Sequence, residues 1–396
     1  MSYKQVYLKP KKEESIKRFH PWIFSGAIAR INGTPEEGEI VEVYDSNGNF
    51  LALGHCQIGS IAVRILTFEN EKIDLHFWEN RFEKAYKLRE SLFITKNPDN
   101  NIYRLVHGEG DNMPGLIVDI YGKTAVIQAH SPGMHYAREE LVKALKNVLN
   151  DSVNSIYYKS DTTLPYKAEL NAINEYLSGE TENSSNIAME NGLRFYIDWE
   201  KGQKTGFFID QRDNRKLVEK YAQNKSVLNM FCYTGGFSVF ALHGGAKLVH
   251  SVDSSTKAMD LTDKNIKLNF PDDDRHQSFS EDAFRFLEKM DEKYDLIILD
   301  PPAFAKHRNA LKNALQGYRK LNALAIEKIE PGGILFTFSC SQAVSKDNFR
   351  LAVLSAAVKA KRNVKIIHQL TQAADHPISI YHPEGEYIKG LVLKIE

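Results

Sequence analysis

The sequence predicts an α/β protein that ends in a doubly wound, mostly parallel sheet, preceded by a small N-terminal β-barrel and a central α+β region. From about residue 190, short apolar runs alternate with helix-like segments, which is typical of parallel strands joined by crossover helices. Up to about residue 75, short apolar runs alternate with Gly, Asn and Asp turns, as in a small barrel. We therefore expect three domains, at 1–75, 76–190 and 191–396.

Length, charge and cysteine content narrow the class of protein. The 396 residues, 42% of them hydrophobic, suffice for several globular cores. Because 51 Lys and Arg balance 51 Asp and Glu, any nucleic-acid binding has to come from local basic clusters. The three cysteines form no Cys-x-x-Cys pair, which predicts free thiols, a reducing compartment and no metal site. No signal-peptide pattern or uncharged apolar run of about eighteen residues is present, which predicts a cytoplasmic protein that does not enter a membrane.

The elements follow from the same periodicities. In the first two domains, strands are expected at 38–44, 50–54, 61–66, 115–121, 123–130 and 155–158, and helices at 74–92 and 136–149. In the third, strands are expected at 227–231, 248–253, 296–300, 334–339, 364–370 and 391–395, with helices at 237–242, 256–270, 282–290, 314–329 and 348–361. The polar segment 178–185 is the expected linker before the third domain. Ligands of such sheets bind beyond the carboxyl ends of the strands, so the motifs located there are the candidates for a site.

A glycine turn follows the first strand of the third domain. Gly235 and Gly236 allow a ligand to approach the backbone closely and open a helix whose first amides face it, although paired glycines also make simple turns. The three-glycine fingerprint of dinucleotide enzymes is absent, which argues against NAD or FAD. We take Tyr233, Thr234 and the two glycines as cofactor contacts.

Acidic residues follow the next two strands. Asp253 ends the second strand, where a carboxylate accepts both hydroxyls of a ribose. A ribose-binding acid without a pyrophosphate loop suits S-adenosylmethionine, while a helix cap is the alternative interpretation of Asp253. Asp282 follows a third strand, which lies between the apolar runs 248–253 and 296–300 and has no predicted bounds. In methyltransferase-like sheets an acid there bonds the adenine amino group. A helix cap is an equal alternative for this residue as well.

The fourth strand ends in Asp300-Pro301-Pro302. Two prolines fix an extended, rigid turn with few amide donors, so that carbonyls and a carboxylate project into the cleft. Methyltransferases that modify amino groups have a related motif with an aromatic residue directly after the second proline. Here Ala303 intervenes before Phe304, which argues against an exocyclic amine as the methyl acceptor.

Cys340 follows the fifth apolar strand and is flanked by serines. A lone cysteine is ordinarily a buried packing residue. Its position at a strand end beside the Asp-Pro-Pro turn favours a nucleophile instead. Cys232, before the glycine turn, is expected to pack.

Five segments together resemble the RlmI-type 23S rRNA cytosine-C5 methyltransferase family: 204–215, 232–238, 251–255, 299–306 and 339–341. The resemblance spans the whole chain, with the N-terminal barrel similar to a PUA domain. It implies a class I, Rossmann-like methyltransferase domain that binds S-adenosylmethionine, with Cys340 as nucleophile. The cofactor contacts that it implies are Asp253, Asp282, Asp300 and Gln211, with which we count the neighbouring Ser254, Ala283 and Pro301.

The implied chemistry needs a thiolate and a base. C5 of cytosine is a poor nucleophile, so a thiolate first adds to C6, C5 takes the methyl group, and a base removes the C5 proton. Many members of the wider RNA cytosine-C5 group carry a second cysteine where this chain has Ala303, so Cys340 is expected to act alone. Asp300 is counted with it as a catalytic residue. The candidate bases lie in a polar loop between the last two strands: Asp375 and His376, and after them His382 and Glu384. A histidine next to a proline is also frequent in simple turns, which is the alternative for His376.

RNA contacts are expected from basic and aromatic residues near the cleft and in the barrel, namely Trp22, Arg104, Pro302, Phe304, Lys306 and Arg308. The alternatives are that the basic residues are solvated charges on the surface of a helix and that the aromatic residues pack in the core. The expected partner is ribosomal RNA, 23S by the resemblance, and a homodimer stays open. Two other functions also stay open: methylation of another RNA atom or of a protein, and non-catalytic RNA binding in ribosome assembly.

Overall fold

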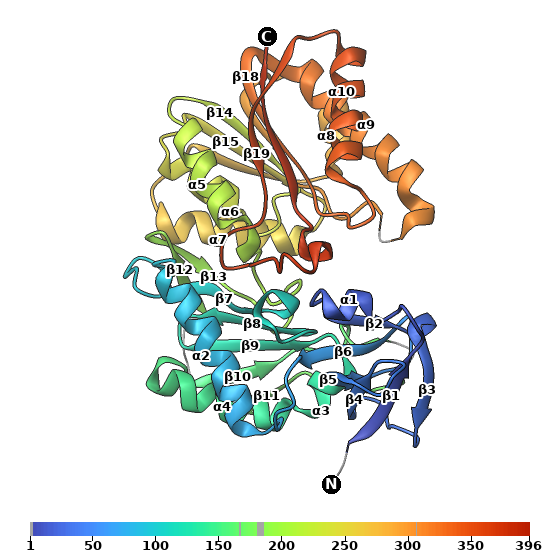
Figure 1. The fold of residues 1–396 in the computed structure, drawn as a ribbon. Coiled ribbons are helices and arrows are strands. Elements are labelled where there is room, and N and C mark those ends of the chain that lie inside the picture. Colours follow the sequence, from blue (N-terminus) through green and yellow to red (C-terminus); the bar gives the residue numbers. More distant parts are fainter. Residues whose placement is uncertain (1–2, 166–167, 180–185, 306) are drawn as a thin grey trace. The chain divides into compact units, whose positions relative to one another are not determined.

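The computed structural model describes residues 3–165, 168–179, 186–305 and 307–396 (Figure 1). They form two compact units. The N-terminal unit contains residues 1–192, 197–209 and 374–385, and the C-terminal unit contains 193–196, 210–373 and 386–396. The chain therefore returns twice to the N-terminal unit, for residues 197–209 and for residues 374–385, and then ends in the C-terminal unit. The expected boundary near residue 75 stays a prediction, and most of the expected linker, 180–185, lies outside the described residues.

The N-terminal unit begins with a six-stranded sheet in the order β2-β6-β5-β4-β1-β3. Its strands are β1 (Lys4–Leu8), β2 (Trp22–Phe24), β3 (Ile28–Asn32), β4 (Ile40–Tyr44), β5 (Phe50–Cys56) and β6 (Ile61–Thr67), with the short helix α1 (Glu14–Lys17) between β1 and β2. β1 and β4 are parallel, and the other neighbours are antiparallel. Alternation along β4 buries Val41 and Val43, which is why this half-apolar run forms a strand with one face in the core.

A second, five-stranded sheet follows in the order β11-β10-β9-β8-β7. Its strands are β7 (Ile102–His107), β8 (Leu116–Tyr121), β9 (Thr124–Ala129), β10 (Ser155–Tyr158) and β11 (Glu175–Ser178), and β12 (Ile187–Glu190) follows in the chain. The helices are α2 (Leu75–Ser91), α3 (Pro132–Tyr136) and α4 (Arg138–Leu149), and α2 packs on α4 (Figure 1). β7 was not among the expected strands because Arg104 interrupts its apolar run. In the fold, this charge is compensated by Asp119 on β8.

The C-terminal unit is a doubly wound sheet in the order β16-β15-β14-β17-β18-β20-β19. The strands are β14 (Ser226–Met230), β15 (Leu248–Asp253), β16 (His276–Ser280), β17 (Tyr294–Leu299), β18 (Ile329–Ser339), β19 (Val364–Leu370) and β20 (Lys389–Ile395), preceded in the chain by β13 (Leu193–Tyr196). The first five of the sheet run parallel, and β20 is antiparallel to both of its neighbours. This arrangement confirms the predicted fold class.

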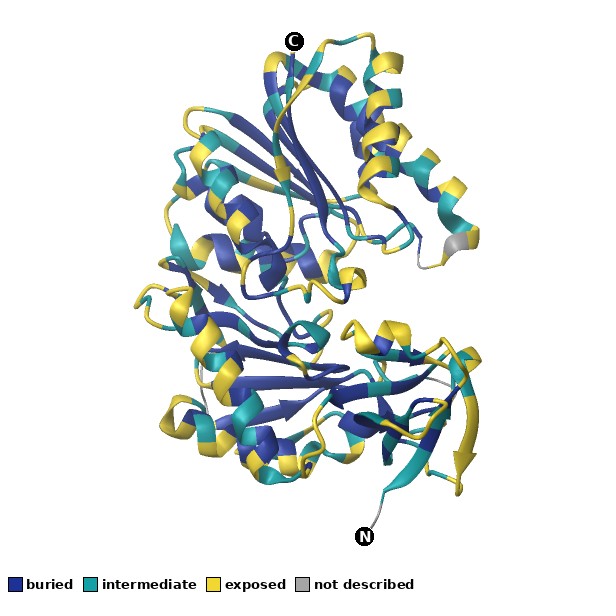
Figure 2. Ribbon diagram, viewed as in Figure 1, coloured by how far each residue is buried: buried dark blue, intermediate teal, exposed yellow. Residues whose placement is uncertain are grey.

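Helices cover both faces of this sheet (Figure 1). One group comprises α5 (Arg212–Tyr221), α6 (Gly236–His243) and α7 (Thr256–Asn269), and the other α8 (Ala283–Lys289), α9 (Leu311–Lys328) and α10 (Lys346–Ala360). The central strands are buried along their length, whereas the outer sides of the helices are exposed (Figure 2). Double coverage explains why these strands read as continuous apolar runs.

Candidate active site

Most of the described site residues that were predicted in the C-terminal unit lie at or after the carboxyl ends of its parallel strands, whereas Gln211 lies just before α5. β14 is the first strand in the chain order of this sheet, and the order then runs outward to β16 on one side and to β18 on the other. The point between β14 and β17 is thus the switch point at which ligands of open α/β sheets bind. Tyr233, Asp300 and Cys340 follow β14, β17 and β18, and Asp253 is the last residue of β15.

The glycine loop after β14 is held in shape by helix α7. Thr262 Oγ1 donates to the carbonyl of Tyr233 at 2.9 Å, and Asn265 Nδ2 donates to the carbonyl of Thr234 at 2.9 Å. Gly235 has φ +76°, and a Cβ atom there would lie 2.6 Å from Thr262 Cγ2. Only glycine fits this position without strain, so the loop offers a fixed backbone at the start of α6.

Asp253 binds the loop and does not cap α7. Its Oδ2 accepts from the Tyr233 amide at 3.0 Å, and its Oδ1 accepts from the Ser255 amide at 3.0 Å. The capping side chain is that of Ser255, which accepts from the amide of Ala258. A carboxylate has about four acceptor positions, so two backbone bonds leave room for ligand hydroxyls. Its neighbour Ser254 is exposed.

Asp282 is the N-cap of α8, where its Oδ1 accepts from the Arg285 amide at 3.0 Å. Its side chain is exposed, whereas Ala283 behind it is buried. The capping alternative is therefore realised, and a capping carboxylate keeps acceptor positions for a ligand amino group. The adenine contact of Asp282 stays a prediction.

Two predicted cofactor contacts from distant segments meet in one hydrogen bond. Gln211 Nε2, just before α5, donates to Asp300 Oδ2 at 3.0 Å. Gln211 Oε1 in turn accepts from Asn214 Nδ2 at 2.6 Å. This chain of amides fixes the orientation of the Asp300 carboxylate at the end of β17.

The Cys340 thiol lies beside the proline turn. Its Sγ is 3.7 Å from the carbonyl oxygen of Pro301, and the side chain is partly exposed. The following Ser341 is fully buried, and its Oγ accepts from the Ala305 amide at 3.2 Å and bonds the Tyr318 hydroxyl at 2.9 Å. The residue after the thiol is thus tied by its side chain to the turn after β17 and to α9.

The other two thiols lie in surroundings that disfavour a thiolate. Burial, with the carboxylates of Glu37 and Glu39, raises the pKa of Cys56 to about 11. Cys232 is buried with its sulfur 3.5 Å from that of Met259, as expected of a packing residue, and burial raises its pKa also.

The predicted substrate contacts after β17 differ in exposure and packing. Pro302 is exposed. Phe304 packs on Tyr318 with ring centroids 4.6 Å apart, and more loosely on Phe284. Lys306 and the side chain of Arg308 lie outside the described part of the chain.

Three other predicted residues come together within the N-terminal unit. The Arg104 amide donates to Asp375 Oδ2 at 2.9 Å, and Asp375 Oδ1 lies 2.9 Å from His376 Nδ1. The Arg104 guanidinium forms a two-bond ion pair with Asp119 at 2.7 and 2.8 Å. Asp375 and His376 are almost fully buried. The loop after β19 therefore belongs structurally to the N-terminal unit, which no local sequence signal indicated.

Trp22, the predicted aromatic contact of the barrel, is half-buried and already hydrogen-bonded. Its indole nitrogen donates to Glu109 Oε1 at 2.7 Å, and Arg64 pairs with the same oxygen at 2.8 Å. The ring packs against His382 with centroids 4.2 Å apart.

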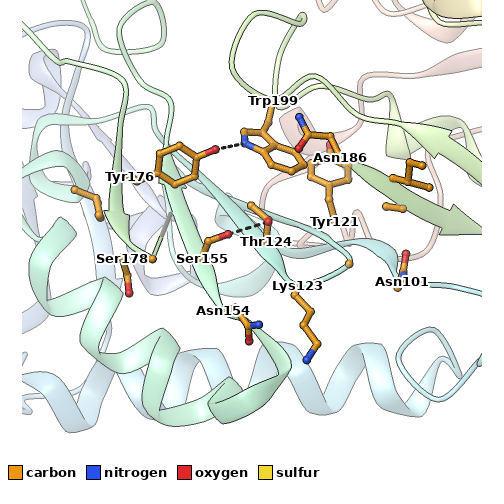
Figure 3. A pocket seen from close by; sticks show the side chains of 15 residues that line it. Asn101, Tyr121, Lys123, Thr124, Asn154, Ser155, Tyr176, Ser178, Asn186 and Trp199 are labelled. Carbon is orange, nitrogen blue, oxygen red and sulfur yellow. Dashed lines mark hydrogen bonds between the residues drawn. The ribbon is translucent and has the colours of Figure 1, made fainter. Parts of the chain in front are cut away.

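A polar pocket of about 950 Å³ lies elsewhere in the N-terminal unit (Figure 3). Asn101, Lys123 and Asn154 line it, and none of the predicted site residues does. Trp199 is also in its wall, but this side chain is only 3% exposed and its indole nitrogen donates to Tyr176 at 3.0 Å. The pocket thus presents hydrogen-bonding groups together with the partly exposed ring of Tyr176.

Sequence reasoning missed one ionisable group beside the thiol. Lys389, the first residue of β20, is 6% exposed, and its Nζ donates to the Ser341 carbonyl at 2.7 Å. The only signal in the sequence is a lysine at the start of an apolar run. In the described ranges, no cluster of His, Cys, Asp or Glu is arranged to hold a metal ion, and no described helix has the length and apolar character of a membrane span.

Comparison with protein families and curated proteins agrees with this geometry. A model of S-adenosylmethionine-dependent methyltransferases matches residues 104–379, and a PUA-like domain model matches residues 6–68. The ribosomal RNA large subunit methyltransferase I of Tolumonas auensis is 42% identical over 98% of both chains. That of Aeromonas salmonicida is 41% identical over 98% of both chains, and that of Escherichia coli 38% over 99% of both.

Solved structures share the fold. A putative S-adenosylmethionine-dependent methyltransferase from Streptococcus mutans matches with a TM-score of 0.84 and 21% identity, covering 100% of both chains. A putative methyltransferase complexed with SAH matches with a TM-score of 0.85. The tRNA m1G37 methyltransferase of M. jannaschii matches with a TM-score of 0.52 at 18% identity, covering 95% of this chain and 92% of that one. At this level of identity the likeness shows the fold alone.

The assignment to a family therefore rests on sequence identity along the whole chain, and the geometry at the strand ends agrees with it. This chain belongs to the ribosomal RNA large subunit methyltransferase I family of S-adenosylmethionine-dependent methyltransferases.

Proposed function

We propose that this protein methylates C5 of a cytosine in large-subunit ribosomal RNA, 23S in bacteria, through a covalent bond between Cys340 and C6. The observation that carries the proposal is the partly exposed Cys340 thiol, 3.7 Å from the Pro301 carbonyl at the end of the neighbouring strand. Identity of about 40% with ribosomal RNA large subunit methyltransferases I supports the substrate class. We also propose that the protein acts in the cytoplasm.

The residues at the strand ends fit S-adenosylmethionine, the cofactor of the family. We assign the ribose hydroxyls to Asp253, the adenine amino group to Asp282 with Ala283, and the remaining contacts to the glycine loop, Ser254, Gln211 and Asp300. The donor set contains carboxylates and backbone amides but no phosphate-binding glycine fingerprint, which suits a cofactor without a pyrophosphate. When bound, the cofactor supplies an electrophilic methyl group.

In the proposed mechanism, the Cys340 thiolate donates an electron pair to C6 of the cytosine, and the ring becomes an enamine that is nucleophilic at C5. After C5 takes the methyl group, a base removes its proton, and the electrons of that C–H bond reform the double bond as the thiolate leaves. Asp300 and Pro301 position the ring edge beside the thiol. Pro302 and Phe304, with Lys306 and Arg308, are assigned to the RNA strand, together with Trp22 and Arg104 of the N-terminal unit.

For the base, we propose His376 oriented by Asp375, since the two side chains are 2.9 Å apart. His376→Asn keeps a side-chain donor toward Asp375 but provides no base. We expect it to methylate slowly and to accumulate a covalent complex with RNA, because the adduct forms but cannot lose its proton. Denaturing gels of enzyme with labelled RNA measure this. A variant that is slow without accumulating adduct would assign the base elsewhere.

The decisive experiment is methylation of large-subunit ribosomal RNA by the wild-type protein and by Cys340→Ser, with Cys56→Ser as matched control. The proposal expects loss of 5-methylcytosine formation for Cys340→Ser alone, with cofactor affinity retained. Bisulfite or mass mapping of ribosomal RNA from a strain lacking the protein identifies the nucleotide. Full turnover by Cys340→Ser would favour another target atom, and absence of cofactor binding in calorimetry would favour a non-catalytic assembly factor.

A further inference from the structure

Lys389 is a buried lysine beside the proposed nucleophile. In the antiparallel pair of β18 and β20 it stands opposite Ser339, the residue before Cys340. Its Nζ donates to the carbonyl of Ser341, the residue after Cys340, at 2.7 Å. The lysine thus bridges the backbone on both sides of the thiol. Lysines are almost never this buried without a partner for their charge.

The charged neighbours of Lys389 are already paired with each other. Glu386, three residues before it, forms an ion pair with Lys346 at 2.5 Å. The Tyr318 hydroxyl bonds Ser341 Oγ, and burial raises the pKa of this tyrosine, which keeps it neutral. Among the residues that the structure describes, no carboxylate lies within ion-pair distance of Lys389 Nζ.

The pKa of Lys389 reflects these neighbours. Burial lowers its pKa to about 8, whereas negative charge on Cys340 and, to a smaller extent, on Glu386 favours its protonated form, and Lys346 opposes it. A buried ammonium costs free energy unless an anion compensates it. The anion with the largest effect is the sulfur of Cys340.

We propose that Lys389 is the counter-ion of the Cys340 thiolate and acts as a positioning residue for the nucleophile. The amine takes up the thiol proton, which gives an ammonium and a thiolate without any further reactant. The ammonium stabilises the thiolate before it adds to C6 and again when the C6–S bond breaks and its electron pair returns to sulfur. The inference rests on the proposed role of Cys340 and extends it.

Alkylation of the free protein tests this without RNA or cofactor. Iodoacetamide modification is followed peptide by peptide across pH 6 to 10 in the wild type, Lys389→Met, Lys389→Arg and Lys394→Met. Lys394 lies on the same strand, is less buried and bonds the Gly332 carbonyl, so its removal is the matched control. Cys56 and Cys232 serve as internal references.

For Lys389→Met we expect Cys340 to react at least tenfold more slowly at pH 7.5, with the rise of its rate displaced to higher pH, because an opposite charge nearby favours the ionised form by about tenfold or more. Lys389→Arg and Lys394→Met should keep the wild-type profile. The thermal unfolding midpoint of Lys389→Met should be unchanged or higher, since Cys340 then stays a neutral thiol and no ion pair has to be desolvated.

Equal Cys340 profiles for the wild type and a folded Lys389→Met would overturn the inference. A second result would also overturn it: Lys389→Met unfolds at a lower temperature and alkylates slowly, and Lys389→Arg does not restore the alkylation rate. This pattern is that of a purely structural lysine. Failure of the proposed function has a different signature. Cys340→Ser would then methylate RNA normally, whatever the alkylation profile of the wild type.

Discussion

At the scale of single residues, Asp253 and Asp282 make a comparable pair. Each carboxylate accepts backbone amides, but Asp253 binds the glycine loop whereas Asp282 caps a helix. The sequence could place both at strand ends and could not decide between cap and ligand contact, because both interpretations require an acid at the same position. The structure gives the capping bond and leaves the ligand contact to experiment.

Substitution by asparagine separates the two roles. Asp253→Asn should weaken cofactor binding about tenfold or more, since hydrogen bonds from ribose hydroxyls to a charged acceptor contribute about 1.5 to 3 kcal/mol. Asp282→Asn should fold normally because asparagine is as good an N-cap as aspartate. Calorimetry with SAH measures both variants. Unchanged affinity of Asp282→Asn would identify Asp282 as a cap alone, and unchanged affinity of Asp253→Asn would remove it from the cofactor site.

At the scale of elements, the apolar runs predicted the central strands because strands covered on both faces tolerate few polar residues. β16 was missed as a bounded strand since His276-Gln-Ser-Phe-Ser280 lies at the sheet edge and carries polar side chains. β7 was missed because its arginine is compensated only in the fold. Lys389 was also missed as a site residue, because the strand beside it is β18, which is distant in the sequence.

The support of the glycine loop by α7 makes a prediction at this scale. Gly235→Ala should lower the free energy of unfolding by about 1 to 3 kcal/mol and weaken cofactor binding, since it adds both backbone strain and a clash. Thr262→Ser removes the clashing methyl group but keeps the hydroxyl, so the double variant should recover part of the loss. Gly48→Ala is the control, with φ +88° and no atom within 4 Å of the added carbon. Denaturation curves measure the free energy of unfolding of each variant. Equal losses for Gly235→Ala and Gly48→Ala would contradict the clash.

At the scale of the whole molecule, buried histidines predict sensitivity to acid. Burial lowers the pKa values of His55, His130 and His276 to about 4. Between pH 6.5 and 4 the unfolded chain binds protons that the folded protein does not, so stability is full above pH 6.5 and falls as the pH decreases toward 4. Each group contributes on the order of 3 kcal/mol to this loss.

Thermal unfolding followed from pH 7.5 to 4.5 measures the effect. The midpoint should fall with pH in the wild type and fall less steeply in His55→Gln, whose side chain does not titrate. Substitution of the exposed His76 is the control and should leave the slope unchanged. A wild-type midpoint that stays constant over this range would contradict the prediction.

The route of the chain between the two units has a consequence for biosynthesis. Residues 374–385 complete the N-terminal unit, and β20, which follows them, completes the C-terminal sheet. A ribosome makes the chain from its N-terminus, so neither unit has all of its residues until these last segments have emerged. Nascent chains released before that point would lack Asp375, His376 and Lys389 together. Folding of both units can therefore be completed only after residues 374–396 have been synthesised.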